Sequence, residues 1–268
     1  QGPPVFGPAA PPLAGFRRFG ENPPTPEEAV RPVIFIPTYN EAPNLERLVR
    51  EIRGIVPDAG IVIVNDESPD GTGEIADRLA AADPAVHVVH RDPPRGRGLA
   101  GRDGYVLALE LGADVVVEMD ADFSHDPRLL PRLFAAIERG ADVVLGSRFV
   151  AGGSDRDRSL WRRVVTVLAN GYIRLVLGVP VGDCNSGYRC FRRETLEAIE
   201  PRTLTSVGPS IVQEVLYRVH RAGARIEEIP LEFFDRKDGE SKLGLGLLLD
   251  GYVMILRLRI LALLGRNP

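Results

Sequence analysis

The feature that most constrains the fold is a regular alternation of short apolar runs with longer segments of helical spacing. Such alternation within about 30 residues is typical of strand–helix–strand units. It predicts one α/β domain with a mostly parallel central sheet and helices on both faces. The expected strands are residues 33–36, 61–64, 86–90, 114–119 and 142–145, and the expected helices are residues 44–55, 73–82, 103–111 and 128–139.

The two ends of the chain differ from this middle part. Residues 1–31 are dense in Pro and Gly without periodicity, which predicts a flexible leader before a folded domain over residues 32–242. Residues 243–268 are rich in leucine but contain Asp250 and Arg257, and such charges cost about 2.5–3.5 kcal/mol each at a bilayer centre. A single membrane span is therefore not expected. An amphipathic helix on a membrane surface is favoured, and a helix packed on the domain also fits.

Composition narrows the class of protein. With 33 Lys and Arg against 37 Asp and Glu, the net charge of -4 argues against a general nucleic-acid binder. Cys184 and Cys190 are too few for a disulfide framework and match no zinc pattern, which favours a reducing cytosol. The amino-terminal stretch has no secretion signal. Together with the amphipathic segment at residues 243–268, these features predict a cytoplasmic protein that is peripherally associated with a membrane.

Polar residues follow the first two expected strands, at residues 37–41 and 65–72. Ligands of open α/β sheets bind outside the carboxyl ends of the strands, which is where both segments lie. Each segment alone also fits ordinary turn and cap chemistry. Together they predict a polar pocket in which Asp66 accepts a hydrogen bond from a nucleobase N–H.

Two carboxylates follow the expected strand over residues 114–119. Residues i and i+2 of an extended segment point to the same side, so Asp120 and Asp122 aim at one point. Mg²⁺ or Mn²⁺ relieves the repulsion between them and prefers such hard oxygen ligands together with substrate phosphates. The alternative is that Asp122 or Asp126 only caps the next helix. The position after a buried strand favours the metal site.

Basic residues occur after strands and in loops, where an anionic ligand would need them. Arginine suits bidentate binding of phosphate, and lysine serves as a mobile point charge. Any one of them alone fits a solvated surface charge. Together they predict an anion site formed from Arg148, Arg162, Arg163, Arg236, Lys237 and Lys242.

Six motifs stand in a fixed order along the chain, at residues 37–41, 66–72, 119–127, 146–148, 183–188 and 239–243. They resemble the motifs of the dolichol-phosphate (polyprenyl-phosphate) mannosyltransferases of glycosyltransferase family 2. The similarity covers roughly residues 31–245. It implies a GT-A-type fold and a catalytic domain over residues 32–242. It also implies a GDP-mannose donor, Mg²⁺ or Mn²⁺, and inverting transfer of mannose to a polyprenyl phosphate.

The resemblance also implies roles for single residues. Asp122 and Arg148 would be catalytic, and Asp120 and Asp122 would bind the metal beside Ala121 and the diphosphate. The nucleoside pocket would be formed by Pro37, Tyr39, Glu41, Val64 and Asp66. Arg148, Arg236 and Lys242 would hold the donor's phosphates, and the acceptor's phosphate would meet Arg162, Thr166, Arg236 and Lys242.

Three departures from the family pattern stand out. Asn65 replaces the first member of a paired acid, which leaves Asp66 to act alone. Ser124 stands where some relatives carry a Gln that helps to bind metal. The glycine-rich loop is altered over residues 95–102.

The implied chemistry needs no strong general base, because a phosphate monoester already carries a charge of about -1.5 to -2 at neutral pH. The protein must align this nucleophile and stabilise the departing nucleoside diphosphate, through the metal and Arg148. Three alternatives stay open: transfer of another sugar such as glucose from UDP-glucose, a nucleotidyltransferase, and a non-catalytic nucleotide-sugar-binding protein. A nucleotidyltransferase should carry a Gly-x-Gly-Thr-Arg-like loop where residues 37–41 stand.

Overall fold

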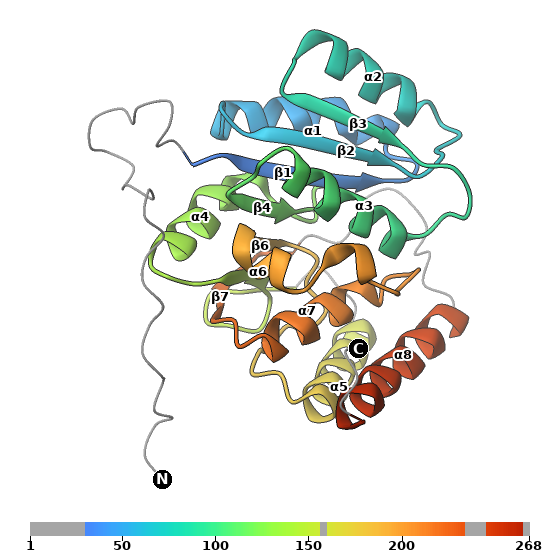
Figure 1. The fold of residues 1–268 in the computed structure, drawn as a ribbon, viewed down its shortest axis with the longest axis vertical. Coiled ribbons are helices and arrows are strands. Elements are labelled where there is room, and N and C mark those ends of the chain that lie inside the picture. The colour runs from blue at the N-terminus through green and yellow to red at the C-terminus, as the bar shows by residue number, and fades with distance from the viewer. Residues whose placement is uncertain (1–29, 156–159, 234–244, 265–268) are drawn as a thin grey trace.

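The computed structural model describes residues 30–155, 160–233 and 245–264. Its centre is a seven-stranded sheet in the order β3-β2-β1-β4-β6-β5-β7 (Figure 1). Neighbouring strands are parallel except at β6, which runs antiparallel to β4 and β5. The strands are β1 (Pro32–Thr38), β2 (Gly60–Asn65), β3 (Val86–His90), β4 (Val115–Glu118), β5 (Val143–Ser147), β6 (Arg189–Arg192) and β7 (Ile226–Pro230).

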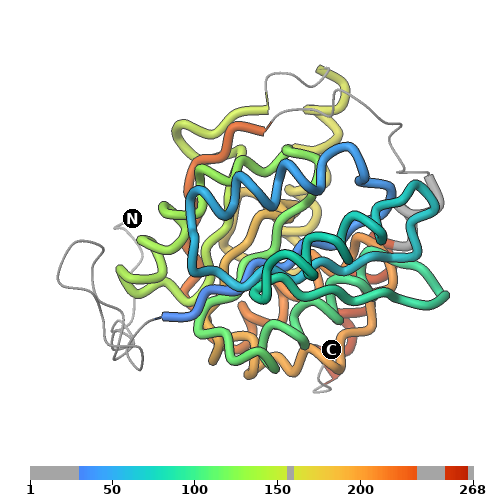
Figure 2. Tube along the Cα trace, turned by 90° about the horizontal axis from the view of Figure 1, so that it is seen from above, coloured from blue at the N-terminus to red at the C-terminus, as the bar shows by residue number. Residues whose placement is uncertain are grey.

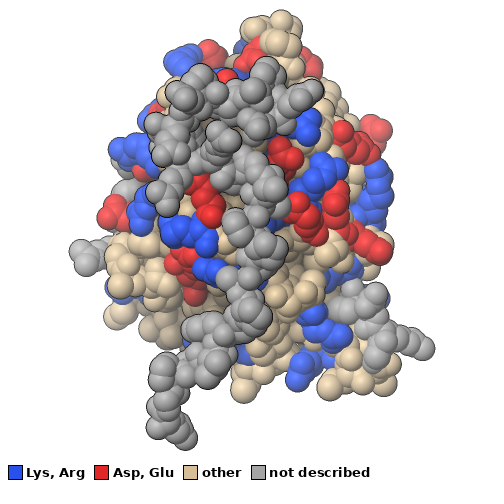
Figure 3. Space-filling view, turned by 60° about the vertical axis from the view of Figure 1, so that its left-hand side comes forward, with Lys and Arg blue, Asp and Glu red and all other residues tan. Residues whose placement is uncertain are grey.

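Helices cover both faces of this sheet because successive strand residues point to opposite sides. Ile34 and Ile36 pack with one set of helices, and Val33 and Phe35 pack with the other. Figure 2 shows the chain trace of this fold from above. Figure 3 shows basic and acidic side chains interspersed on one face of the molecule. The first set is α1 (Ala42–Ile55), α2 (Thr72–Ala82) and α4 (Leu130–Glu138). The second set is α3 (Arg97–Glu110), α5 (Leu160–Leu177), α6 (Arg193–Ala198), α7 (Ile211–Arg221) and α8 (Leu245–Leu263).

The predicted α/β class, with a mostly parallel sheet and helices on both faces, is confirmed. The helices predicted over residues 44–55 and 73–82 begin within two residues of α1 and α2, and the other two predicted helices differ more. Helix α3 begins at Arg97 rather than at residue 103, although glycines weaken its first turns. The helix predicted over residues 128–139 is divided into a 3₁₀ turn, Pro127–Leu129, and α4. A further 3₁₀ turn, Pro201–Thr203, precedes α7.

The order of the strands places a crevice beside β1. The chain moves outward from β1 to β2 and β3, and then returns to β4 on the other side of β1. At such a reversal the connecting loops part outside the carboxyl ends of the strands, and ligands of α/β proteins bind there. The loops after β1, β2 and β4 therefore form the first candidate site.

Helices α5 and α8 pack against each other at one end of the molecule (Figure 1). The rings of Tyr172 and Tyr252 meet edge to face with centroids 5.0 Å apart. Ile255 and Leu258 bury one side of α8 in the core. The structure thus shows α8 packed on the domain. No helix in the described ranges has the length and apolar character needed to cross a bilayer.

Candidate active site

The three loops at the crevice share an unusual backbone feature. Asn40, Glu67 and Phe123 follow β1, β2 and β4, and their φ angles are 58°, 55° and 60°. Non-glycine residues adopt this left-handed conformation rarely, and such residues gather at functional sites. The three strand ends thus have specialised loop geometry side by side.

The residues predicted to line a nucleoside pocket come together at the ends of β1 and β2. Pro37 lies opposite Val64 in the parallel register. The phenol oxygen of Tyr39 accepts a hydrogen bond from Arg95 Nη1 at 3.1 Å, and the guanidinium of Arg95 lies over the ring, 5.3 Å from its centroid. Glu41 is the residue before α1, and its N–H donates to Thr72 Oγ1 at 2.9 Å. The aromatic ring and the arginine offer a stacking surface of the kind that binds a planar base.

Asp66 has partners within the protein. Its carboxylate accepts a hydrogen bond from the Gly96 N–H at 2.7 Å and pairs with Arg91. Arg91 also holds Asp103 through Nε at 2.7 Å. Asp66 therefore ties the loop after β3 to the end of β2. A carboxylate has about four lone-pair sites, so these bonds leave acceptor capacity for a nucleobase N–H.

The Asp120–Asp122 segment is held by the residues that follow it. Asp122 Oδ1 accepts hydrogen bonds from Ser124 N–H at 3.1 Å and from the Ser124 hydroxyl at 2.6 Å. The N–H of Asp120 donates to His125 Nδ1 at 2.9 Å, which places the His125 proton on Nε2. The imidazole is stacked on Tyr188, and burial lowers the pKa of His125 and keeps it neutral. The backbone of Asp120 and the carboxylate of Asp122 are thus held in place by neighbouring side chains.

These two carboxylates fit a metal ion whose remaining ligands come from a substrate phosphate and water. The described residues contain no cluster of three His, Cys, Asp or Glu side chains that would hold an ion alone. Mg²⁺ is usually bound by one or two carboxylates together with substrate phosphates and water. Gly187 lies beside the segment, where a Cβ would come within 3.5 Å of Asp120 Oδ2 and 3.3 Å of the His125 ring. The glycine therefore leaves open space at Asp120.

Arg97 and Glu118 form a charged pair that the sequence analysis did not identify. Arg97 Nη2 lies 2.6 Å from Glu118 Oε1 and 3.2 Å from Asp120 Oδ1. Glu118 is buried, and its other carboxylate oxygen accepts a hydrogen bond from the Tyr105 hydroxyl. Burial acts to lower the pKa of Arg97, but the charges of Glu118 and Asp120 outweigh it and raise this pKa above its ordinary value. The only sequence signal was the altered glycine-rich loop.

Arg148 lies at the end of β5, where it is bound bidentately by Asp183. Its Nε and Nη2 donate to the two Asp183 oxygens at 2.7 Å each. Burial acts to lower the pKa of Arg148, but the hydrogen bonds and charge of Asp183 outweigh it and raise this pKa. A guanidinium has five N–H donors, and these bonds use two of them. Arg148 is therefore held rigidly and retains donors for an anion.

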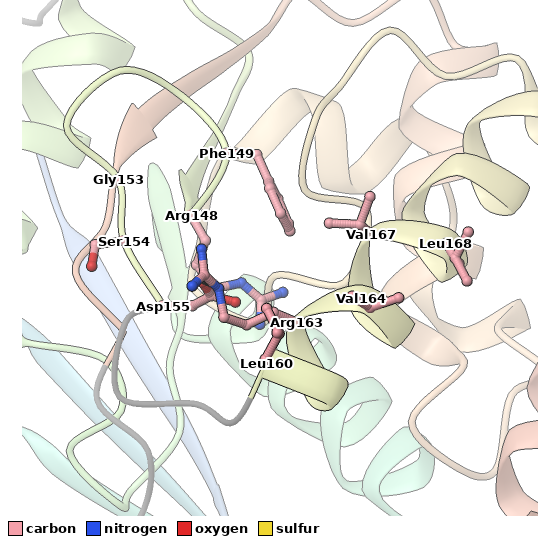
Figure 4. Close-up of a pocket in the computed structure, with 10 residues that line it drawn as sticks. All are labelled: Arg148, Phe149, Gly153, Ser154, Asp155, Leu160, Arg163, Val164, Val167 and Leu168. Carbon is pink, nitrogen blue, oxygen red and sulfur yellow. Dashed lines mark ion pairs between the residues drawn. The ribbon is translucent and has the colours of Figure 1, made fainter.

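A pocket of about 490 Å³ lies beside Arg148 (Figure 4). Its charged end is formed by Arg148, Asp155 and Arg163, with Arg163 Nε 3.1 Å from Asp155 Oδ1. Its other lining residues include the apolar side chains of Phe149, Leu160, Val164, Val167 and Leu168. The pocket is therefore amphipathic, with cationic groups at one end and α5 as an apolar wall.

The predicted acceptor-phosphate residues are only partly described. Arg162 and Thr166 lie on α5, outside the residues that line this pocket, and the Thr166 hydroxyl donates to the Arg162 carbonyl at 2.8 Å. Arg163, which follows Arg162 in sequence, lines the pocket instead. Arg236 and Lys242 lie outside the described residues.

The fold and the site together define a GT-A-type glycosyltransferase. The crystal structure of glucosyl-3-phosphoglycerate synthase from Mycobacterium tuberculosis with Mn²⁺ and UDP-glucose matches with a TM-score of 0.62. That match covers 90% of this chain and 82% of that chain at 20% identity, and it shows the fold alone. The family model for glycosyl transferase family 2 matches residues 33–200. The chain belongs to glycosyl transferase family 2.

Curated relatives confirm the group within the family that the motifs predicted. The polyprenol monophosphomannose synthase of Mycolicibacterium smegmatis is 43% identical over 226 residues, which cover 84% of this chain and 85% of that protein. The undecaprenyl-phosphate mannosyltransferase of Micrococcus luteus is 42% identical over 228 residues, which cover 85% of this chain and 93% of that protein. The dolichol-phosphate mannosyltransferase of Pyrococcus furiosus is 36% identical, and the match covers 78% of this chain and 58% of that protein.

Proposed function

We propose that this chain transfers mannose from GDP-mannose to a polyprenyl phosphate, with inversion at the anomeric carbon and with Mg²⁺ or Mn²⁺. The observation that carries the proposal is the amphipathic pocket beside Arg148. A lipid phosphate has a charged end and an apolar tail. The arginines of this pocket would meet the charged end, and the apolar side chains of α5 would meet the tail. The names of the relatives support the same acceptor class.

The donor is proposed to lie along the ends of β1, β2 and β4. Tyr39 and Asp66 would bind the nucleoside, and the Asp120–Asp122 pair would hold the metal beside the diphosphate. The metal would neutralise charge on the departing nucleoside diphosphate. Arg148, which Asp183 holds in place, would donate hydrogen bonds to the same leaving group.

The acceptor is proposed to enter from the pocket side. Its phosphate is the nucleophile, and with a charge of about -1.5 to -2 it needs no base to activate it. Arg163 is tied to Asp155, which lies at the charged end of the pocket with Arg148. These side chains would align the phosphate oxygen against the anomeric carbon, and alignment is the main task left to the protein.

The test is transfer of radiolabelled sugar to a polyprenyl phosphate in detergent. GDP-mannose, UDP-glucose and UDP-N-acetylglucosamine are compared with and without Mn²⁺. We expect a labelled lipid only with GDP-mannose and metal. A lipid product from a UDP-sugar alone would change the donor and keep the acceptor, whereas no lipid product from any donor would contradict transfer to a lipid phosphate.

Membrane association is proposed to occur through α5 and α8. Val253, Leu256 and Ile260 on α8 are exposed apolar residues, and Arg257 and Arg259 are exposed on the same helix. Helix α5 adds exposed Trp161, Leu168 and Leu175. Exposed apolar and basic side chains on adjacent helices fit an anionic bilayer surface. We propose that the protein binds the cytoplasmic face of a membrane peripherally, next to its acceptor.

The double substitution L256S/I260S should weaken binding to phosphatidylglycerol-containing vesicles by about tenfold. Serine in place of these two apolar side chains removes much of the free energy gained when they move from water into the bilayer surface. Vesicle sedimentation measures the effect. Val207→Ser serves as the control, because Val207 is 53% exposed but belongs to neither helix: it is in the loop before α7. Equal binding of the double variant and the control would refute this membrane surface.

A further inference from the structure

The first turn of α3 brings an arginine to the metal-binding segment. Arg97 reaches from this turn to the carboxyl end of β4, where its Nη2 contacts both Glu118 and Asp120. The Arg97 side chain is 24% exposed and the Glu118 side chain 1%. A cation of the protein therefore lies directly against one of the two proposed metal ligands.

Close backbone packing fixes the position of the Arg97 main chain. A Cβ on Gly96 or Gly98 would overlap the carbonyl oxygens of Val207 and Ser206, so only glycine permits the approach. The Gly98 N–H also donates to the Val207 carbonyl at 2.8 Å. The first turn of α3 is therefore held against the segment that precedes α7.

Gly101 leaves the space through which the Arg97 side chain extends. A Cβ on Gly101 would come within 3.2 Å of Arg97 Nη1, so the guanidinium passes over this glycine. Tyr105, one helical turn further on, donates its hydroxyl to Glu118. The helix thus contributes both the arginine and the second partner of the carboxylate that holds it.

The pairing has a direct electrostatic consequence. Glu118 and Asp120 share one guanidinium, and Glu118 is the nearer of the two, at 2.6 Å against 3.2 Å. The guanidinium of Arg97 offsets part of the negative charge at Asp120 and orients its Oδ1. A divalent cation bound by Asp120 and Asp122 would feel the same positive charge as a repulsion.

We propose that Arg97 is a positioning residue that holds Asp120 and lowers the affinity of the Asp120–Asp122 pair for a divalent cation. The metal would then bind well only when a diphosphate adds its own negative charge. This inference rests on the metal dependence included in the proposed function. It assigns a role to the altered glycine-rich loop, whose second arginine is Arg97.

The test compares variants in which Glu118 is neutral, so that no buried carboxylate is left without its cation. E118Q, R97K/E118Q and R97M/E118Q are titrated with Mn²⁺, with and without GDP, and free Mn²⁺ is followed by electron paramagnetic resonance. Circular dichroism confirms that each variant is folded. We expect R97M/E118Q to bind Mn²⁺ about tenfold more tightly than E118Q without GDP. R97K/E118Q should stay near E118Q because it keeps the charge.

Arg102→Met in the E118Q background is the matched control, because Arg102 lies on the same helix and pairs with Asp103. It should leave the Mn²⁺ affinity within about twofold of E118Q, because the Arg102 side chain is partly exposed and its charge is already paired with Asp103. Equal or weaker Mn²⁺ binding by R97M/E118Q than by E118Q would overturn the inference. If the wild-type protein and Asp122→Ala both fail to bind Mn²⁺ in the presence of GDP, the metal dependence itself fails, and the inference fails with it.

Discussion

Asp122→Ala is expected to lower the rate of mannose transfer by about a thousand-fold at saturating Mn²⁺, which corresponds to about 4 kcal/mol of transition-state stabilisation. Asp122 is one of two carboxylates in the proposed metal site. Its Oδ1 accepts two hydrogen bonds from Ser124, so the side chain is oriented before any ligand binds. Alanine removes the ligand, and added metal cannot restore it. Initial rates measured over a series of Mn²⁺ concentrations test this.

Asp126→Ala is the matched control for this variant. Asp126 lies in the same loop but caps the turn Pro127–Leu129, where its carboxylate accepts the Arg128 N–H at 2.9 Å. Loss of such a cap costs about 0.5–2 kcal/mol of stability. Transfer should stay within a few-fold of wild type once the protein is folded. Near-normal turnover of Asp122→Ala would refute the metal role.

Asp183→Asn is expected to lower the free energy of unfolding by about 3–5 kcal/mol, because it removes one partner of a buried ion pair. The Asp183 side chain is fully buried, and the Arg148 side chain is 8% exposed. The neutral amide no longer compensates the guanidinium charge. Its NH₂ group also replaces one of the two oxygens that accept hydrogen bonds from Arg148. The melting temperature, followed by circular dichroism, should fall by about 6–20 °C for a domain of this size.

Glu46→Gln provides the comparison for this change. It makes the same acid-to-amide substitution in an exposed pair on α1, where the side chains of Arg50 and Glu46 are 72% and 57% exposed. Exposed pairs of this kind contribute less than about 1 kcal/mol. If the two variants melt at the same temperature, the Arg148–Asp183 pair does not stabilise the fold as its burial indicates.

Local sequence patterns determined the fold class and the main parts of the site. Period-two and helical spacing are set by backbone geometry, so residues 33–145 predicted the strand–helix alternation that the structure shows. Ligands of open α/β sheets bind outside the carboxyl ends of the strands, so Asp66 and Asp120, which each follow an expected strand, were predicted to be site residues. The Asp120–Asp122 spacing and the ordered motifs then indicated the family.

Tertiary structure alone decided which charges meet. Arg97 is 21 residues from Glu118 and Arg148 is 35 residues from Asp183, and local spacing carries no record of contacts at such separations. Whether Arg162 or Arg163 enters the pocket depends on how α5 is rotated against the sheet, which its packing with α8 and the core determines. The antiparallel strand β6, which carries the Asp183 loop back to Arg148, depends on long-range pairing in the same way. Sequence therefore determined the framework and the kind of chemistry, whereas packing between distant segments decided the partners of each charge.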